Sequence, residues 1–162
     1  MRYLMRKHLF SIGDDFWVED ENGNRVMRVD GKVLRVRQTF VLEDADGHEL
    51  ATVRKKLIAL RESMNIERDG EVVATVRRAW FAPFRQRFDV DLGDGDGLVV
   101  QGNITDHEYD VKDDGVTLAE ISKRWFTVRD TYAVDVAPDV DVALVLAITV
   151  AVDWMGHEEE HD

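Results

Sequence analysis

The chain has 162 residues, a length typical of one domain, and contains no cysteine. Disulfide bonds, thiolate metal sites and thiol nucleophiles are therefore excluded, and this cysteine usage favours a reducing compartment. The formal net charge of −12 argues against attraction of the whole surface to nucleic acid or anionic lipid, although it is compatible with a local basic patch.

The charged residues have an unusual balance. Asp (21) outnumbers Glu (12), and Arg (15) outnumbers Lys (6), which is typical of a surface that stays hydrated in concentrated salt. We interpret this as a halophilic-type surface, because high salt screens the self-repulsion of such a charge. Residues 1–10 have cationic side chains among the apolar ones and lack the continuous apolar core of a signal peptide. We therefore expect a cytoplasmic protein, with peripheral attachment to a membrane surface as an option.

Self-similarity is the strongest structural signal along the chain. Five segments each contain an alternating apolar run, an acidic glycine-containing turn and a second alternating run, and they begin at Phe16, Phe40, Met64, Phe88 and Tyr109. Their starts lie 24, 24, 24 and 21 residues apart, a period that holds two strands and two turns. Asn-Gly or Asp-Gly pairs at 22–23, 46–47, 69–70 and 114–115 supply the positive φ that tight turns need. The pattern predicts five β-hairpins.

These hairpins imply a closed sheet. In the second hairpin, Phe40, Leu42, Ala51 and Val53 share one apolar face, so its register is well specified. Two further strands, near residues 4–12 and 132–136, bring the expected number to about twelve. That is more than an open twisted sheet usually carries, so we predict a mostly β fold, an antiparallel barrel built from repeated hairpins.

A barrel of this width needs a filling that its own side chains do not supply, and one segment is suited to that role. Residues 142–152 are apolar on every side and too few to cross a bilayer as a helix. Their Ala and Leu favour helix while their Val and Ile favour strand, so propensity leaves both open. Length and the flanking Pro138, Asp139 and Asp141 favour a central hydrophobic helix at about 140–153. We expect one domain over residues 1–155 and a polar tail at 156–162.

Two stretches of the sequence resemble a known family. They read DHEYDVKDDGVTLAEISKRWFTVRDTYAVDV (residues 106–136), followed by the apolar segment, and SMNIERDGEVVATVRRAWFAPFRQRFDVD (residues 63–91). This is similar to the prokaryotic branch of the LURP-one-related family of tubby-like proteins, over nearly the whole chain. The most specific part is the order Ile121, Ser122, Lys123, Trp125, Asp130 and Tyr132. The resemblance implies a twelve-stranded barrel wrapped around a hydrophobic C-terminal helix.

The resemblance implies less about function than about fold. Tubby-like domains of animals bind phosphoinositides through a basic surface site, phospholipid scramblases are similar in fold, and plant LURP-one relatives are linked to pathogen defence. The lipid-contact motif of tubby domains does not match positions in this chain, so no residue role is carried over from it. The resemblance also implies no catalytic residues.

Basic residues gather where the second strand of several hairpins ends. If those strand ends share one rim of the barrel, the cations form a patch that holds phosphate groups, with Arg offering two parallel hydrogen bonds. The alternative is that each cation pairs with a neighbouring Asp or Glu. The predicted anion-binding residues are Arg54, Lys55, Lys56, Arg77, Arg78, Arg85, Arg87, Lys123 and Arg124.

The sequence predicts neither a catalytic site nor a metal site. Residues 157–161 match the letters H-E-x-x-H, but they follow Gly156 and have no third ligand after them, so a zinc site is not predicted. No acid, base and nucleophile are brought together by local spacing, and no cofactor is expected.

Three functions are left open. The first is a non-enzymatic binding or scaffold domain whose basic rim meets an anionic lipid headgroup or another phosphate-bearing ligand. The second is a regulatory barrel that binds a protein partner and no small ligand. The third and least favoured is an enzyme with a pocket at a barrel mouth. Nucleic acid is not expected as a partner.

Overall fold

The described residues form a mostly β domain with one helix. A computed structural model describes residues 1–6, 16–31, 38–56, 61–79, 86–123 and 131–156. Its elements are β1 (Arg2–Arg6), β2 (Phe16–Glu19), β3 (Arg25–Gly31), β4 (Thr39–Asp44), β5 (Glu49–Lys55), β6 (Ser63–Arg68), β7 (Glu71–Arg78), β8 (Gln86–Asp91), β9 (Gly97–Asn103), β10 (Glu108–Asp113), β11 (Val116–Ser122), β12 (Thr131–Val136) and α1 (Val142–Gly156).

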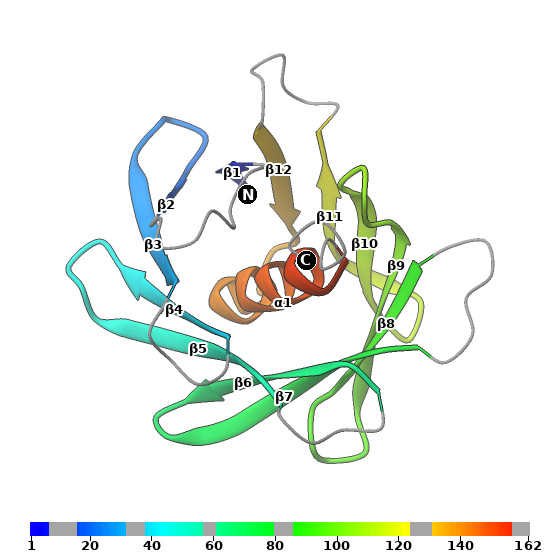
Figure 1. Cartoon of the computed structure of the whole chain (residues 1–162). Helices are drawn as coiled ribbons and strands as arrows, with labels where there is room; N and C mark the ends of the chain where they lie inside the picture. The colour runs from blue at the N-terminus through cyan, green and yellow to red at the C-terminus, as the bar shows by residue number, and fades with distance from the viewer. Residues whose placement is uncertain (7–15, 32–37, 57–60, 80–85, 124–130, 157–162) are drawn as a thin grey trace.

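The strands form a closed antiparallel barrel around α1 (Figure 1). Each strand pairs with its neighbours in the sequence, and β1 closes the ring by pairing with β12. The ladder between β1 and β2 contains a single pair, Leu4 with Glu19, whereas β1 and β12 share five pairs. The predicted twelve-stranded barrel of repeated hairpins, including a strand at 132–136, is confirmed.

The hairpin turns use the glycines that the sequence singles out. Asp69 and Gly70 both have positive φ, at 51° and 81°, which is the backbone of a two-residue turn matched to the twist of its strands. At the β4–β5 turn only Gly47 has positive φ, at 88°, and its N–H donates to the carbonyl of Asp44. Local turn chemistry therefore fixes where each hairpin reverses.

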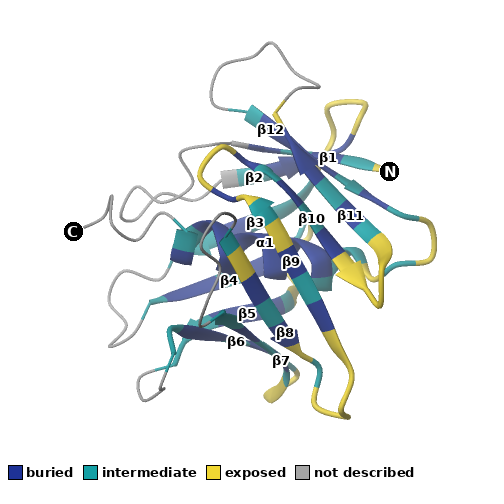
Figure 2. Ribbon diagram, turned by 90° about the vertical axis from the view of Figure 1, so that its right-hand side faces the viewer, coloured by how far each residue is buried: buried dark blue, intermediate teal, exposed yellow. Residues whose placement is uncertain are grey.

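The barrel interior is lined by alternate residues of the strands. Phe40 pairs with Val53 and Leu42 with Ala51, and all four side chains are buried, as the alternation predicts. Dark blue therefore alternates along the strands and covers most of the helix in Figure 2, while exposed residues concentrate at the turns.

Helix α1 fills the barrel. Residues 145–153 are all buried, which confirms the predicted central helix, although α1 begins two residues later and ends three residues later than expected. Asp141 is its N-cap, because its Oδ1 accepts the N–H of Leu144 at 3.2 Å. Arg68 holds the same carboxylate through two hydrogen bonds of 2.5 and 2.9 Å. Within the described residues, no helix combines the length and hydropathy needed to cross a bilayer.

The barrel has two distinct ends. At the turn end lie the hairpin turns of β2–β3, β4–β5, β6–β7, β8–β9 and β10–β11, together with the start of α1. At the loop end lie the last residues of the odd-numbered strands, the first residues of the even-numbered ones and the end of α1. Between strands at the loop end, the structure describes one complete connection, residues 104–107 from β9 to β10.

Candidate functional site

The predicted basic residues occupy one end of the barrel. Arg54 and Lys55 end β5, Lys56 follows it, Arg77 and Arg78 end β7, Arg87 is near the start of β8, and Lys123 follows β11. All of these positions belong to the loop end, so the strand ends share one rim. Arg85 and Arg124 lie outside the described residues, as does the 157–161 motif.

Most of the described basic residues at this rim have a carboxylate partner. The ion pairs are Arg54 with Glu67 at 2.9 Å, Arg87 with Asp89 at 3.1 Å, Arg77 with Asp91 at 3.4 Å and Lys123 with Asp106 at 3.7 Å. These side chains are partly open to water, and ion pairs of that kind add little to stability. The basic residues therefore share one rim and also pair with neighbouring carboxylates. Anion binding by these residues stays a prediction.

Arg78 has a structural role beside its charge. Its Nε donates to Glu62 Oε2 at 3.0 Å, and its Nη2 donates to the main-chain carbonyl of Met155 near the end of α1. The guanidinium also lies 5.1 Å from the centre of the Phe88 ring. A cation at a helix C-terminus satisfies free carbonyls and complements the helix dipole. Arg78 therefore fastens the helix to the barrel wall.

The charges differ between the two ends of the barrel. Cations such as Arg25 and Arg68 also lie toward the turn end, but acidic side chains outnumber them there. The acidic residues at or beside its turns are Asp20, Glu21, Asp44, Asp46, Asp69, Asp94, Asp96, Asp113 and Asp114. Among the described residues, positive side chains are thus concentrated at the loop end.

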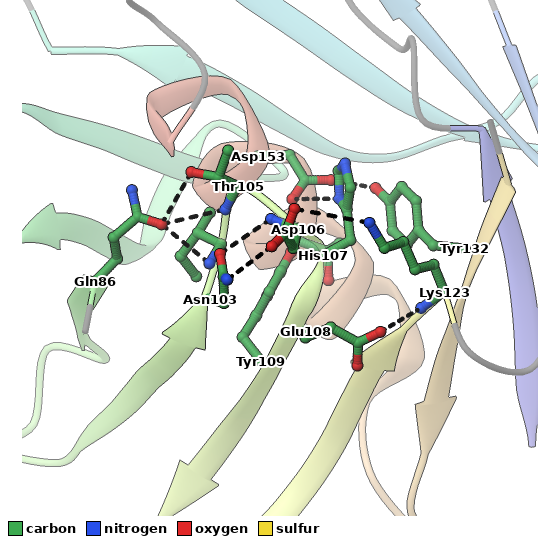
Figure 3. Close-up of polar contacts among 12 residues, drawn as sticks. Gln86, Asn103, Thr105, Asp106, His107, Glu108, Tyr109, Lys123, Tyr132 and Asp153 are labelled. Atoms are coloured by element: carbon green, nitrogen blue, oxygen red, sulfur yellow. Dashed lines mark hydrogen bonds and ion pairs between the residues drawn. The ribbon is translucent and has the colours of Figure 1, made fainter. Parts of the chain in front are cut away.

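A buried polar cluster ties α1 to the wall near the loop end (Figure 3). Asp153, on α1, accepts hydrogen bonds from the hydroxyl of Tyr109 at 2.7 Å and from the hydroxyl of Tyr132. His107 Nδ1 lies 3.5 Å from the same carboxylate, and its ring stacks on Tyr132 at 4.3 Å between centres. All four side chains are at most 2% exposed.

Burial, reinforced by the charge of Asp153, raises the pKa of Tyr109 and of Tyr132 well above the usual tyrosine value. Both phenols therefore keep their protons at neutral pH and serve as donors. Sequence reasoning does not predict this cluster, because Tyr109 and Tyr132 are distant from Asp153 in the sequence and no local spacing links them. The signal available was a carboxylate on a helix expected to be buried on all sides, which requires internal donors.

The connection from β9 to β10 completes this corner of the barrel. Gln86 Oε1 accepts the N–H groups of Ile104 and Thr105 at 3.0 and 3.2 Å. Ile104 is fully buried against Gly156, where an added Cβ would lie 2.4 Å from an Ile104 methyl carbon. The connection therefore inserts one apolar side chain next to the end of α1, which is why the helix ends in glycine.

A polar groove of about 610 Å³ lies over β8–β10 beside this connection. It is lined by Gln86, Gln101, Gly102, Asn103, Thr105, Glu108, Tyr109 and Asp110. Gly102 has a φ of 147°, and an added Cβ would lie 2.5 Å from the carbonyl oxygen of Glu108. Only glycine fits there, because β10 approaches so closely where Tyr109 passes inward toward Asp153.

Within the part of the chain that the structure describes, one group of potential metal ligands occurs, at the β4–β5 turn. Asp44, Asp46 and His48 each offer an atom within 4.8 Å of the others. Asp44 Oδ1 accepts the N–H groups of Asp46 and His48, both at 2.9 Å, which accounts for the grouping as ordinary turn geometry. Metal binding is not inferred from it.

Comparisons with known proteins identify the family. The LURP-one-related family model matches residues 1–153, so the chain belongs to the LURP-one-related family. It is 23% identical to the uncharacterized protein YxjI of Bacillus subtilis, covering 98% of this chain and 96% of that one. It is 24% identical to protein LURP-one-related 15 of Arabidopsis thaliana, covering 96% and 80% of the two chains.

A solved structure shares the fold. The X-ray structure of an Arabidopsis thaliana protein matches with a TM-score of 0.70 at 22% identity, covering 95% of this chain and 91% of the other. The family expected from the sequence is thus confirmed, as is its barrel architecture.

Proposed function

We propose that this member of the LURP-one-related family is a non-enzymatic binding domain that recognises an anionic group, such as a lipid headgroup, at the loop end of its barrel. The observation that carries this proposal is the separation of charge between the two ends. A protein with a net charge of −12 repels anions overall, so an anionic ligand needs a local region where cations are concentrated.

The chemistry of the rim supports this assignment. Arg54, Arg77 and Arg87 present guanidinium groups, which match phosphate oxygens with paired hydrogen bonds. Arg77 and Arg87 now pair with the partly exposed carboxylates of Asp91 and Asp89, and such pairs are exchanged at small cost, whereas the Arg54–Glu67 pair is less exposed. A phosphate with two negative charges attracts these cations more strongly than one carboxylate does.

The buried cluster supports a role other than catalysis. Asp153, His107 and the two tyrosines are titratable groups in close contact, which is a feature of many active sites. Here they lie in the hydrophobic interior between α1 and the wall, where their hydrogen bonds fasten the helix. We infer a structural role for them and assign recognition to the rim.

A vesicle co-sedimentation experiment tests the proposal. The variant R54Q/K55Q/K56Q removes three cations from the end of β5, and N22D/V72E/V116E adds three anions at exposed positions near the turn end. Both lower the formal net charge from −12 to −15. The probes are phosphatidylcholine vesicles with and without a polyphosphorylated phosphoinositide.

The rim variant is expected to lose affinity for the anionic vesicles. Each cation near an anionic surface contributes about 1 kcal/mol, so three amount to roughly a 100-fold weaker partition. The control variant should bind nearly as the wild type does. Equal losses in the two variants, or no preference of the wild type for anionic vesicles, would refute the assignment.

A further inference from the structure

The groove over β8–β10 is a built concavity that the anion-binding proposal does not use. Its side chains come from three adjacent strands and the connection at 104–107, and Figure 3 shows Gln86, Asn103, Thr105, Glu108 and Tyr109 among them. Gly102 lies in its wall without a side chain. The groove is therefore shaped by strand register and by close backbone approach, and its polar groups converge from different parts of the chain.

Several of these groups are held in fixed orientations by residues that do not line the groove. Glu108 Oε2 accepts the Ser122 hydroxyl at 2.7 Å, and Glu108 Oε1 accepts the N–H of Lys123 at 3.2 Å. Gln86 Oε1 accepts the N–H of Ile104, which fixes the plane of its carboxamide. Such anchoring lowers the entropy cost of binding, because the side chains are ordered before a ligand arrives.

The lining has a defined chemical character. Glu108 and Asp110 are two residues apart on β10 and line the same groove, and the eight lining residues include three carboxamides and no cation. The carboxylates accept hydrogen bonds only, so the lining favours a positively charged ligand that carries several donors. A positively charged group of the chain itself already lies nearby. Lys112 Nζ is 3.6 Å from Asp110 Oδ2, and both side chains are exposed.

We propose that this groove is a second binding site, for a guanidinium or alkylammonium group. The group donates hydrogen bonds to the Glu108 and Asp110 carboxylates and to the carboxamide oxygens of Gln101 and Asn103. Lys112 competes with it for Asp110. The donor is either a free polyamine or guanidino compound, or an arginine side chain of a partner protein; both sources share the chemistry that the groove recognises.

The experiment follows the side-chain carboxamide and backbone amide signals of the ¹⁵N-labelled full chain by NMR. Agmatine and spermidine are titrated in separate samples, followed by a short peptide with one central arginine and blocked ends. Saturable shifts are expected at the Gln101 and Asn103 carboxamides and at Gly102. Saturation by agmatine or spermidine indicates a free small molecule, whereas saturation by the peptide alone indicates a partner chain; either result supports the site.

Two variants with opposite expected effects on binding and one matched control test the proposal. Asp110→Asn should weaken binding by about 10-fold, as expected for the loss of one charge-assisted hydrogen bond. Lys112→Gln should strengthen it, because an internal competitor is removed. Asp96→Asn changes the net charge as Asp110→Asn does, but on the exposed β8–β9 turn, and should leave binding unchanged. Shifts spread over all acidic turns without saturation, or equal losses in Asp110→Asn and Asp96→Asn, would overturn the proposal.

Discussion

Removal of one hydroxyl from the buried cluster should destabilise the whole barrel. The change is Tyr132→Phe, which keeps the ring, its volume and its stacking on His107. It removes only the donor to Asp153 Oδ2, and the carboxylate keeps its bond from Tyr109 at 2.7 Å. The variant therefore isolates one hydrogen bond in a fully buried site.

The expected loss is about 2–4 kcal/mol of unfolding free energy. A hydrogen bond to a charged group contributes about 1.5–3 kcal/mol, and the remainder is the cost of removing one donor from a fully buried carboxylate. Tyr3→Phe is the matched control, because the Tyr3 hydroxyl donates to the Met1 sulfur at 3.3 Å. Because sulfur is a weak acceptor, the control should lose less than about 0.5 kcal/mol.

Equilibrium urea unfolding followed by tryptophan fluorescence measures both variants. The comparison uses the midpoint at an unchanged denaturant slope, so that the difference reports stability and not a change in the unfolded state. If Tyr132→Phe and Tyr3→Phe had the same midpoint within error, the cluster would not fasten α1 to the wall, and the structural role assigned to it would be wrong.

Two further outcomes follow from the same structure. The raised pKa values of Tyr109 and Tyr132 mean that the folded state holds their protons more tightly than the unfolded state does. The stabilisation from these two tyrosines is therefore fully present below about pH 10. Above that pH, the unfolding free energy falls by up to about 1.4 kcal/mol per pH unit for each tyrosine. Urea midpoints between pH 8 and 11.5 measure this decrease, and a flat profile would contradict it. Gly102→Ala should lower the unfolding free energy by several kcal/mol, because its Cβ would lie 2.5 Å from the Glu108 carbonyl oxygen. Gly47→Ala has nothing within 4 Å of its Cβ, so it should lower the unfolding free energy by about 1 kcal/mol through the positive φ alone. Thermal unfolding of the two glycine variants checks the ranking, and equal melting temperatures would argue against the close β9–β10 approach.

The fold was predictable from the sequence because its determinants are local and repeated. Glycine turns recur with the hairpins, alternation gives each strand its inner face, and the apolar segment has no place in water. The expected helix included Asp153 but stopped there, whereas α1 continues to Gly156 and buries Met155 as well. Asp153 is compatible with a buried helix once two tyrosines provide donors, which propensity scales do not register.

The functional geometry was less accessible to sequence reasoning. Tyr109 and Tyr132 are separated from Asp153 by 44 and 21 residues, so only the closed barrel brings them to one carboxylate. The groove depends on the register of three strands and on one glycine. The shared rim of the basic strand ends follows from the direction of the strands, but the carboxylate partner of each cation depends on the register across the sheet.

The order of elements has a consequence for biosynthesis. The segment that fills the barrel is the last secondary-structure element of the described chain, and the strand that closes the ring against β1 immediately precedes it. On the ribosome, early hairpins thus emerge with apolar inner faces and nothing to cover them until the final helix leaves the exit tunnel. The completed core forms late and joins residues distant in the sequence, which favours slow folding and gives chaperones a long interval in which to bind the nascent chain.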